Sequence, residues 1–270
     1  MVIMVVLAIL LLVGLYFLWK WLYGGGDSQD MVIYSSPSDG LPAKDRNPTV
    51  YTGAQVPQIY GGGEYSISTW IYVTNWGINK GKNKPFLVLS GGAPQTTGFM
   101  TLVMYLGQFT NKLGVRVSVE SQSGNTGDLT FNRDYNAIVG GTSPYTDSSP
   151  DFKKCDIEQV DLQKWVNITA VLTGRTIDIY IDGKLSRSCL LDGLFKVDGE
   201  TPTLKLGGPD GFGGIIGMTR AANFAYSPDR VYSYYQEGPF SSFSLSSLNP
   251  GDYSFDIKRN GSTVFSSSTN

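Results

Sequence analysis

Residues 165–181 decide the fold: Trp165-Val166-Asn167-Ile168-Thr169-Ala170-Val171-Leu172 is followed by Thr173-Gly174-Arg175 and by Thr176-Ile177-Asp178-Ile179-Tyr180-Ile181. Both long runs are rich in β-branched and aromatic residues, which favour strands. Asp182-Gly183 comes directly after them, and this dipeptide is typical of a tight hairpin turn. The stretch therefore predicts two strong strands joined by a short turn.

Runs of similar texture recur along the chain, at 65–73, 85–90, 99–106, 113–120, 203–206 and 214–224. In the run 113–120, valines alternate with Arg116, Ser118 and Glu120, so we expect one face of this strand to lie in water. Residues 121–154 are polar and rich in Gly, Ser and Asp, and we expect a long loop with one strand near 129–131. Many short strands with turn signals predict an all-β fold, an antiparallel β-sandwich.

One short helix is predicted near 228–237. Ser227 is a suitable N-cap, and Pro228 suits the first helical position. Gly238 and Pro239 then end the helix.

The N-terminal segment is apolar, with no charged residue from Met1 to Trp19. A helix of this length spans the hydrocarbon core of a bilayer, which is about 30 Å thick. Aromatic and cationic residues typical of the membrane interface gather at the end of the run: Tyr16, Trp19, Lys20, Trp21 and Tyr23. We expect one transmembrane helix over residues 1–23 and a single-pass membrane protein. Its orientation stays open because Lys20 is the only charge near the anchor.

Two other interpretations of this segment are a cleaved signal peptide and a buried core helix. A signal peptide has basic residues before its apolar run and small residues at its cleavage site, and this segment has neither. Uninterrupted apolarity on every face argues against a core helix.

The remaining chain divides into three parts by composition. Residues 24–63 are predicted to be a Gly/Pro-rich linker with an edge strand at 31–34, and residues 64–239 the sandwich domain. Residues 240–270 are predicted to be a Ser-rich linker and a C-terminal β-hairpin that turns at Asn260-Gly261.

Composition excludes several classes of function. The formal net charge is −2, so no bulk basic field indicates nucleic-acid binding. The chain has no His, which removes the commonest general base and the commonest metal ligand. With two Cys, it has neither a disulfide scaffold nor a Cys-rich zinc site.

The strand motifs resemble those of laminin G-like, concanavalin A-like jelly rolls. The resemblance covers about residues 60–240 and rests on these segments: Tyr65–Ile71, Trp165–Thr169, Ile177–Leu185, Leu204–Gly208 and Gly213–Val231. With an N-terminal anchor, and with Cys155 and Cys189 as a pair, the chain is similar to concanavalin-like proteins of large DNA viruses. That resemblance implies a virion component, a minor capsid protein between the inner membrane and the capsid shell.

Enzymatic activity is not expected. A retaining glycosidase of this fold needs two close Glu in a Glu-x-Asp-x-x-Glu pattern, which the chain lacks. The nearest acidic run, Asp156–Asp161, is predicted to be a solvated turn. The segment Gly207–Gly214 lacks the Lys-Ser/Thr of a phosphate loop and is predicted to be a turn between strands. We therefore assign no catalytic residue.

No cofactor or metal is expected. Calcium would need convergent carboxylates in loops, and loop aspartates usually serve turns, so no ligand is assigned. The candidates are: Asp128, Asp134, Asp147, Asp151 and Asp210.

Three further features concern covalent chemistry and partners. Cys155 and Cys189 either form a disulfide across the end of the hairpin or remain two free thiols. Of two glycosylation sequons, that of Asn167 lies in a strand, whereas that of Asn260 lies at a hairpin tip and is a candidate for use. Aromatic residues beside the helix either pack on the domain or bind a partner: Tyr232, Tyr234, Tyr235, Phe240 and Phe243.

Together these features predict a non-enzymatic, membrane-anchored interaction module. Its expected partners are the lipid bilayer, through residues 1–23, and other capsid or virion proteins, but not nucleic acid. The alternative is a membrane-displayed lectin that binds glycans. In both interpretations the anchor sets where the domain lies. For the virion protein we expect a position between an inner membrane and the capsid shell.

Overall fold

The computed structural model describes residues 29–90, 99–120, 129–130, 135–141, 153–197, 201–240, 254–259 and 262–268. Within these residues no helix is both long enough and apolar enough to cross a bilayer. The predicted anchor, residues 1–23, lies outside them, so it stays a prediction.

Two antiparallel sheets pack face to face. The first has the order β1-β15-β4-β11-β12-β13, with β2 also paired to β15. Its strands are: β1 (Asp30–Tyr34), β2 (Leu41–Pro42), β4 (Glu64–Asn75), β11 (Trp165–Thr173), β12 (Thr176–Ile181), β13 (Lys184–Leu190) and β15 (Gly213–Ala222). The predicted hairpin is confirmed as β11 and β12, with register from Thr173↔Thr176 to Ile168↔Ile181.

The second sheet has the order β10-β8-β7-β5-β14-β3. Its strands are: β3 (Thr49–Thr52), β5 (Lys84–Ser90), β7 (Leu102–Leu106), β8 (Leu113–Val117), β10 (Lys153–Lys154) and β14 (Thr203–Leu206). The core between the sheets is made of aliphatic and aromatic side chains at alternate positions of each strand, among them Ile67, Ile71 and Ile168. The prediction of an antiparallel β-sandwich is confirmed.

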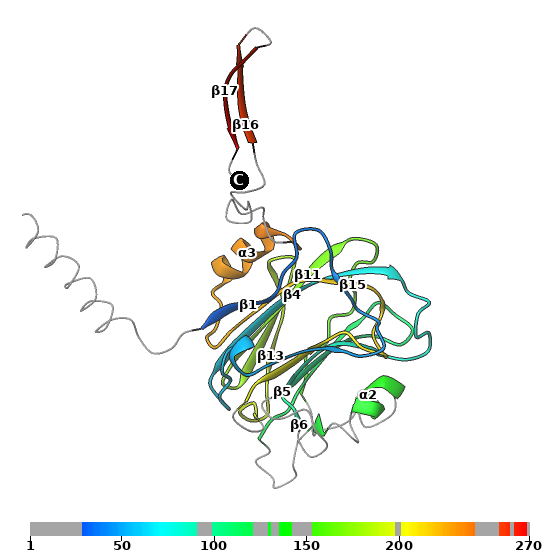
Figure 1. Ribbon diagram of the computed structural model, residues 1–270. Coiled ribbons are helices and arrows are strands. Elements are labelled where there is room, and N and C mark those ends of the chain that lie inside the picture. The colour runs from blue at the N-terminus through cyan, green and yellow to red at the C-terminus, as the bar shows by residue number, and fades with distance from the viewer. Residues whose placement is uncertain are drawn as a thin grey trace, which may run out of the picture.

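Small elements cover the outer faces of both sheets. Helix α3 (Pro228–Glu237, orange) lies on the sheet that contains β1, β4, β11 and β15, and α2 (Asn136–Gly140) lies on the side of β5 (Figure 1). The predicted cap is present, because Ser227 Oγ accepts a hydrogen bond from the Arg230 N–H. Two short strands, β6 (Phe99–Met100) and β9 (Leu129–Thr130), pair with each other, and β9 matches the strand expected near 129–131.

The predicted C-terminal hairpin is also present. Strands β16 (Ser254–Arg259) and β17 (Ser262–Ser268) form a two-stranded sheet of their own. Asn260, at its turn, lies outside the described residues.

Residues 30–63 differ from the expected linker. The edge strand predicted at 31–34 is confirmed as β1, but β2, β3 and the 3-10 helix η1 (Gly53–Gln55) follow it. Strand β2 joins the first sheet and β3 joins the second. Pro and Gly end these strands after two to four residues. So few residues show no alternation of apolar and polar side chains from which a strand could be predicted.

The wet face predicted for 113–120 is wrong for Arg116 and Ser118, although Glu120, after the end of β8, is exposed. Arg116 is 2% exposed and Ser118 is fully buried. The outer face of this sheet carries a second small core of Val88, Met100, Val103, Tyr105 and Ile138. Residues from α2 thus cover a face that the alternation of valines assigned to water.

Candidate binding site

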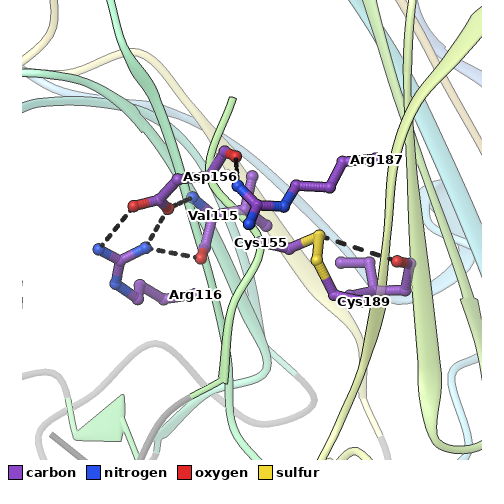
Figure 2. The surroundings of a disulfide bond; sticks show 7 residues. Val115, Arg116, Cys155, Asp156, Arg187 and Cys189 are labelled. Atoms are coloured by element: carbon purple, nitrogen blue, oxygen red, sulfur yellow. Dashed lines mark hydrogen bonds and ion pairs between the residues drawn. A yellow bond between two sulfur atoms is a disulfide. The ribbon is translucent and has the colours of Figure 1, made fainter. Parts of the chain in front are cut away.

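A disulfide and a hydrogen bond from Arg187 to the Asp156 backbone oxygen join the two sheets along one edge. Cys155 follows β10, the edge strand of one sheet, and Cys189 lies in β13, the edge strand of the other. Their sulfur atoms are bonded, with the Cα atoms 5.9 Å apart. Of the two alternatives that the sequence left open, a disulfide or two free thiols, the structure has the disulfide. The bond links the two sheets, rather than only closing the end of one hairpin (Figure 2).

Asp156, next to this disulfide, is the centre of a buried charge cluster. Its carboxylate accepts hydrogen bonds from both terminal nitrogens of Arg116 and from the Val115 N–H at 3.0 Å (Figure 2). The Lys112 ammonium lies 2.8 Å from the same carboxylate. Asp156 is 6% exposed, so the prediction that residues 156–161 form a solvated turn is wrong for Asp156.

The pKa of Asp156 shows which effect dominates in this cluster. Burial alone would raise the pKa of the carboxyl group, but Arg116, Lys112 and the Val115 N–H together hold it below its usual range. The backbone oxygen of Asp156 also accepts a hydrogen bond from Arg187 of β13 at 2.7 Å. The carboxylate of Asp156 thus binds β8, its backbone oxygen binds β13, and the residue serves the structure.

A pocket opens on the outer face of the six-stranded sheet. Val88 of β5 and Lys205 of β14 are cross-strand partners at its floor. The cavity measures about 220 Å³, and its other lining residues are Pro48, Tyr135, Gly207 and Pro209. Tyr135 is the residue before α2, so this short helix positions the phenol over the sheet.

The polar groups of the pocket are partly desolvated. Burial raises the pKa of the Tyr135 phenol, and the carboxylate of Asp210, which accepts a hydrogen bond from it, raises it further. Burial lowers the pKa of the Lys205 ammonium. A phenol and an ammonium therefore lie beside the apolar surfaces of Val88 and two prolines. This set of groups suits a small ligand that has both hydroxyl groups and an apolar face.

The predicted aromatic cluster mostly packs α3 onto the sheet. The Tyr235 ring stacks on Trp70 at 5.6 Å, and the Phe240 ring meets Trp165 edge-on at 5.2 Å. Gly217 allows this close approach, because a Cβ there would lie 2.9 Å from the Trp165 ring. Tyr232 is the outward member, with 47% of its surface exposed.

Of the other predicted site residues, the structure describes Asn167 and Asp210 but not the rest. Asn167 is fully buried and donates to Ser68 Oγ at 3.1 Å, so its sequon is inside the sheet. Those that lie outside the described residues are: Tyr16, Trp19, Lys20, Trp21, Tyr23, Asp128, Asp134, Asp147, Asp151, Phe243 and Asn260. Of the calcium candidates, only Asp210 is described, and it faces Tyr135. No group of three or more metal-ligating side chains occurs among the described residues.

Sequence reasoning missed the pocket residues Tyr135 and Lys205. Tyr135 lies in a segment whose polar composition predicted a loop, and Lys205 is a single cation in a short apolar strand. The predicted turn at 207–214 is confirmed between β14 and β15, and it supplies one wall of the pocket.

No protein-family model and no curated protein sequence matches the chain. Among solved structures, it is similar to the binding domain of botulinum neurotoxin serotype G, with 13% identity and a TM-score of 0.45. The serotype D binding domain gives 12% identity and a TM-score of 0.45; the serotype D domain in complex with N-acetylneuraminic acid gives 13% and 0.42. Each match covers 79% of this chain and 47% of the other. The chain thus spans about half the length of these domains, and the fold assignment rests on its own strand order.

Proposed function

We propose that the chain is a non-enzymatic binding module held at a membrane by residues 1–23. The observation that carries this proposal is a pocket with polar side chains on a sandwich whose two sheets are joined to each other. The Cys155–Cys189 disulfide and the Arg187 hydrogen bond to the Asp156 backbone oxygen join the sheets, while Tyr135 and Lys205 line a preformed pocket. A stiff sandwich with a shaped recess suits recognition, because its groups are ordered before a partner arrives.

The virion role belongs to the same proposal in a more specific form. The resemblance to concanavalin A-like jelly rolls with an N-terminal anchor supports a minor capsid protein that ties an inner membrane to the capsid shell. Crosslinking mass spectrometry on native material tests it. Crosslinks from exposed lysines such as Lys184 to shell proteins are expected. Crosslinks only to copies of this chain or to glycoproteins would contradict the capsid role.

A second candidate function is glycan binding, which the pocket favours. A single sugar ring has an apolar face that suits the Tyr135 ring and the prolines, and hydroxyl groups that suit the Lys205 ammonium. The small volume matches one ring rather than an extended chain.

A glycan array followed by calorimetric titration of the full chain in detergent tests this function. The variants Lys205→Met and Tyr135→Phe each remove one polar group while keeping most of the side-chain volume. Each is expected to weaken binding by about tenfold. Val50→Ser is the matched control, because Val50 is the other cross-strand neighbour of Lys205 and does not line the pocket. Equal binding by all variants would exclude the pocket.

A further inference from the structure

The chain enters the sandwich at one identifiable end. Asp30, the first residue of β1, pairs with Ala222 of β15, and Ala222 pairs with Ser66 near the start of β4. The entry point is therefore the end at which β4 begins. From Tyr23 to Asp30 the chain has seven residue steps, which span at most about 25 Å.

Three large apolar side chains are exposed at this same end. They are Tyr60, Leu190 and Leu194, with 63%, 62% and 40% of their surfaces accessible. They come from a loop before β4, the end of β13 and the loop after β13. Apolar side chains exposed together at one end of a domain indicate a contact surface.

Hydrogen bonds connect these three positions to the entry point. The Gln58 N–H donates to Gln29 Oε1 at 3.2 Å, which holds the Tyr60 loop beside the start of β1. The Gly62 N–H donates to the Phe195 oxygen at 2.9 Å and joins this loop to that of Leu194. The Leu191 N–H donates to the backbone oxygen of Arg175 in the β11–β12 turn, which is level with the first residue of β4.

We propose that Tyr60, Leu190 and Leu194 form a membrane-facing rim that rests in the lipid headgroup region. This inference depends on the proposed anchor, because the anchor brings this end of the sandwich within about 25 Å of the bilayer. A tyrosine with flanking leucines suits the interface, where one side of a residue is apolar and the other is wet. The rim would fix the tilt of the sandwich on the membrane.

Anionic lipid is not expected to be needed. Exposed charged residues at this end are mostly acidic, with Glu64, Glu120 and Asp192 against Arg175. Since polybasic segments are what draw a protein to anionic lipid, the rim is expected to engage a neutral bilayer.

The opposite end of the sandwich supplies a matched control. Strand β4 has 12 residues, so the two ends are about 40 Å apart. Phe109, in the β7–β8 turn, is 74% exposed. Its turn lies at the far end, because Asn111 accepts from the Val160 N–H and the nearby Gln163 donates to Val73 of β4.

The experiment uses the full chain in phosphatidylcholine liposomes, with a fluorophore at one introduced cysteine. Both native cysteines are joined to each other, so a single new thiol is labelled uniquely. Gly61→Cys places the probe beside Tyr60, and a Cβ there meets nothing closer than 3.6 Å. Thr110→Cys places it beside Phe109. Quenching by a lipid with a spin label on its headgroup reports how near each probe is to the bilayer.

The expected result is strong quenching at residue 61 and little at residue 110. Replacing Tyr60, Leu190 and Leu194 together by Ser should lower quenching at 61 to the level at 110, whereas Phe109→Ser should leave it unchanged. Equal quenching at both positions, in a chain that floats with the liposomes, would overturn the rim and leave the anchor intact. A chain that does not float with the liposomes would overturn the anchor, and the rim with it.

Discussion

Replacing Asp156 by Ala should be among the most damaging single changes in the sandwich. The Arg116 guanidinium is 2% exposed, and the Asp156 carboxylate is its ion-pair partner. Removing the carboxylate leaves a buried charge without this partner and leaves the Val115 N–H without its acceptor. Breaking a buried pair in this way costs about 3–5 kcal/mol of unfolding free energy. We expect a loss of about 4 kcal/mol.

The second arm of the experiment removes the stranded charge. Arg116→Met retains an apolar stem of similar length that still packs on Tyr105, whose ring the guanidinium covers at 5.2 Å. In the Asp156→Ala background, this second change should restore about 1–3 kcal/mol, since an apolar replacement of a buried pair is often nearly neutral. The double-mutant cycle then gives the interaction energy of the pair.

The assay is urea unfolding of the full chain in nonionic detergent at pH 7, followed by tryptophan fluorescence. Lys164→Met is the matched control. The Lys164–Asp161 ion pair is exposed on both sides, so its loss should leave the unfolding midpoint unchanged. A loss below about 1 kcal/mol for Asp156→Ala would refute the reasoning, as would a double variant less stable than the single one.

Three other predictions use the same assay. Replacing Cys155 and Cys189 by Ser should cost about 3.8 kcal/mol in the chain-entropy model for a 34-residue separation, and dithiothreitol should then have no further effect on the variant. The pKa of Asp156 is lowered in the folded protein. The ionised carboxylate therefore contributes fully to the free energy of unfolding above the unfolded pKa of about 3.9, and this contribution is lost as pH falls through the lower folded pKa. Stability should thus fall as the pH drops below about 4, and Asp156→Asn should flatten that fall; an equally steep fall in the variant would contradict this. Tyr226→Phe should lower the free energy of unfolding by about 1.5 kcal/mol, because the buried Tyr226 hydroxyl donates a hydrogen bond to Asp30 at 2.9 Å. Amide exchange in β1 should become faster in this variant. Unchanged exchange would count against a role of this hydrogen bond in holding β1.

The strands were predictable where their period or composition is strong. Strands β4, β11 and β12 stand out by their β-branched and aromatic content, and α3 by Ser227, Pro228 and Gly238. The short strands β2 and β3 were not predictable, because two to four residues give no measurable period. Their pairing is fixed by the neighbouring strands instead.

The site was less predictable than the fold. Tyr135 and Lys205 are 70 positions apart in number, and only the packing of α2 over β5 and β14 brings them to one pocket. The burial of Arg116 was not predictable either. Its place in an alternating strand predicted exposure, yet a covering layer and the Asp156 carboxylate bury it.

The sequence by itself determined an apolar N-terminal segment of membrane-spanning length, an antiparallel β-sandwich behind it and the two ends of one helix. These features follow from local composition and period, which act over a few residues. Only the tertiary structure decided that the disulfide joins two sheets, that Asp156 is buried, and that three apolar residues share the end where the chain enters. Those facts depend on contacts between residues far apart in the chain, and strand order rather than composition sets which of them meet.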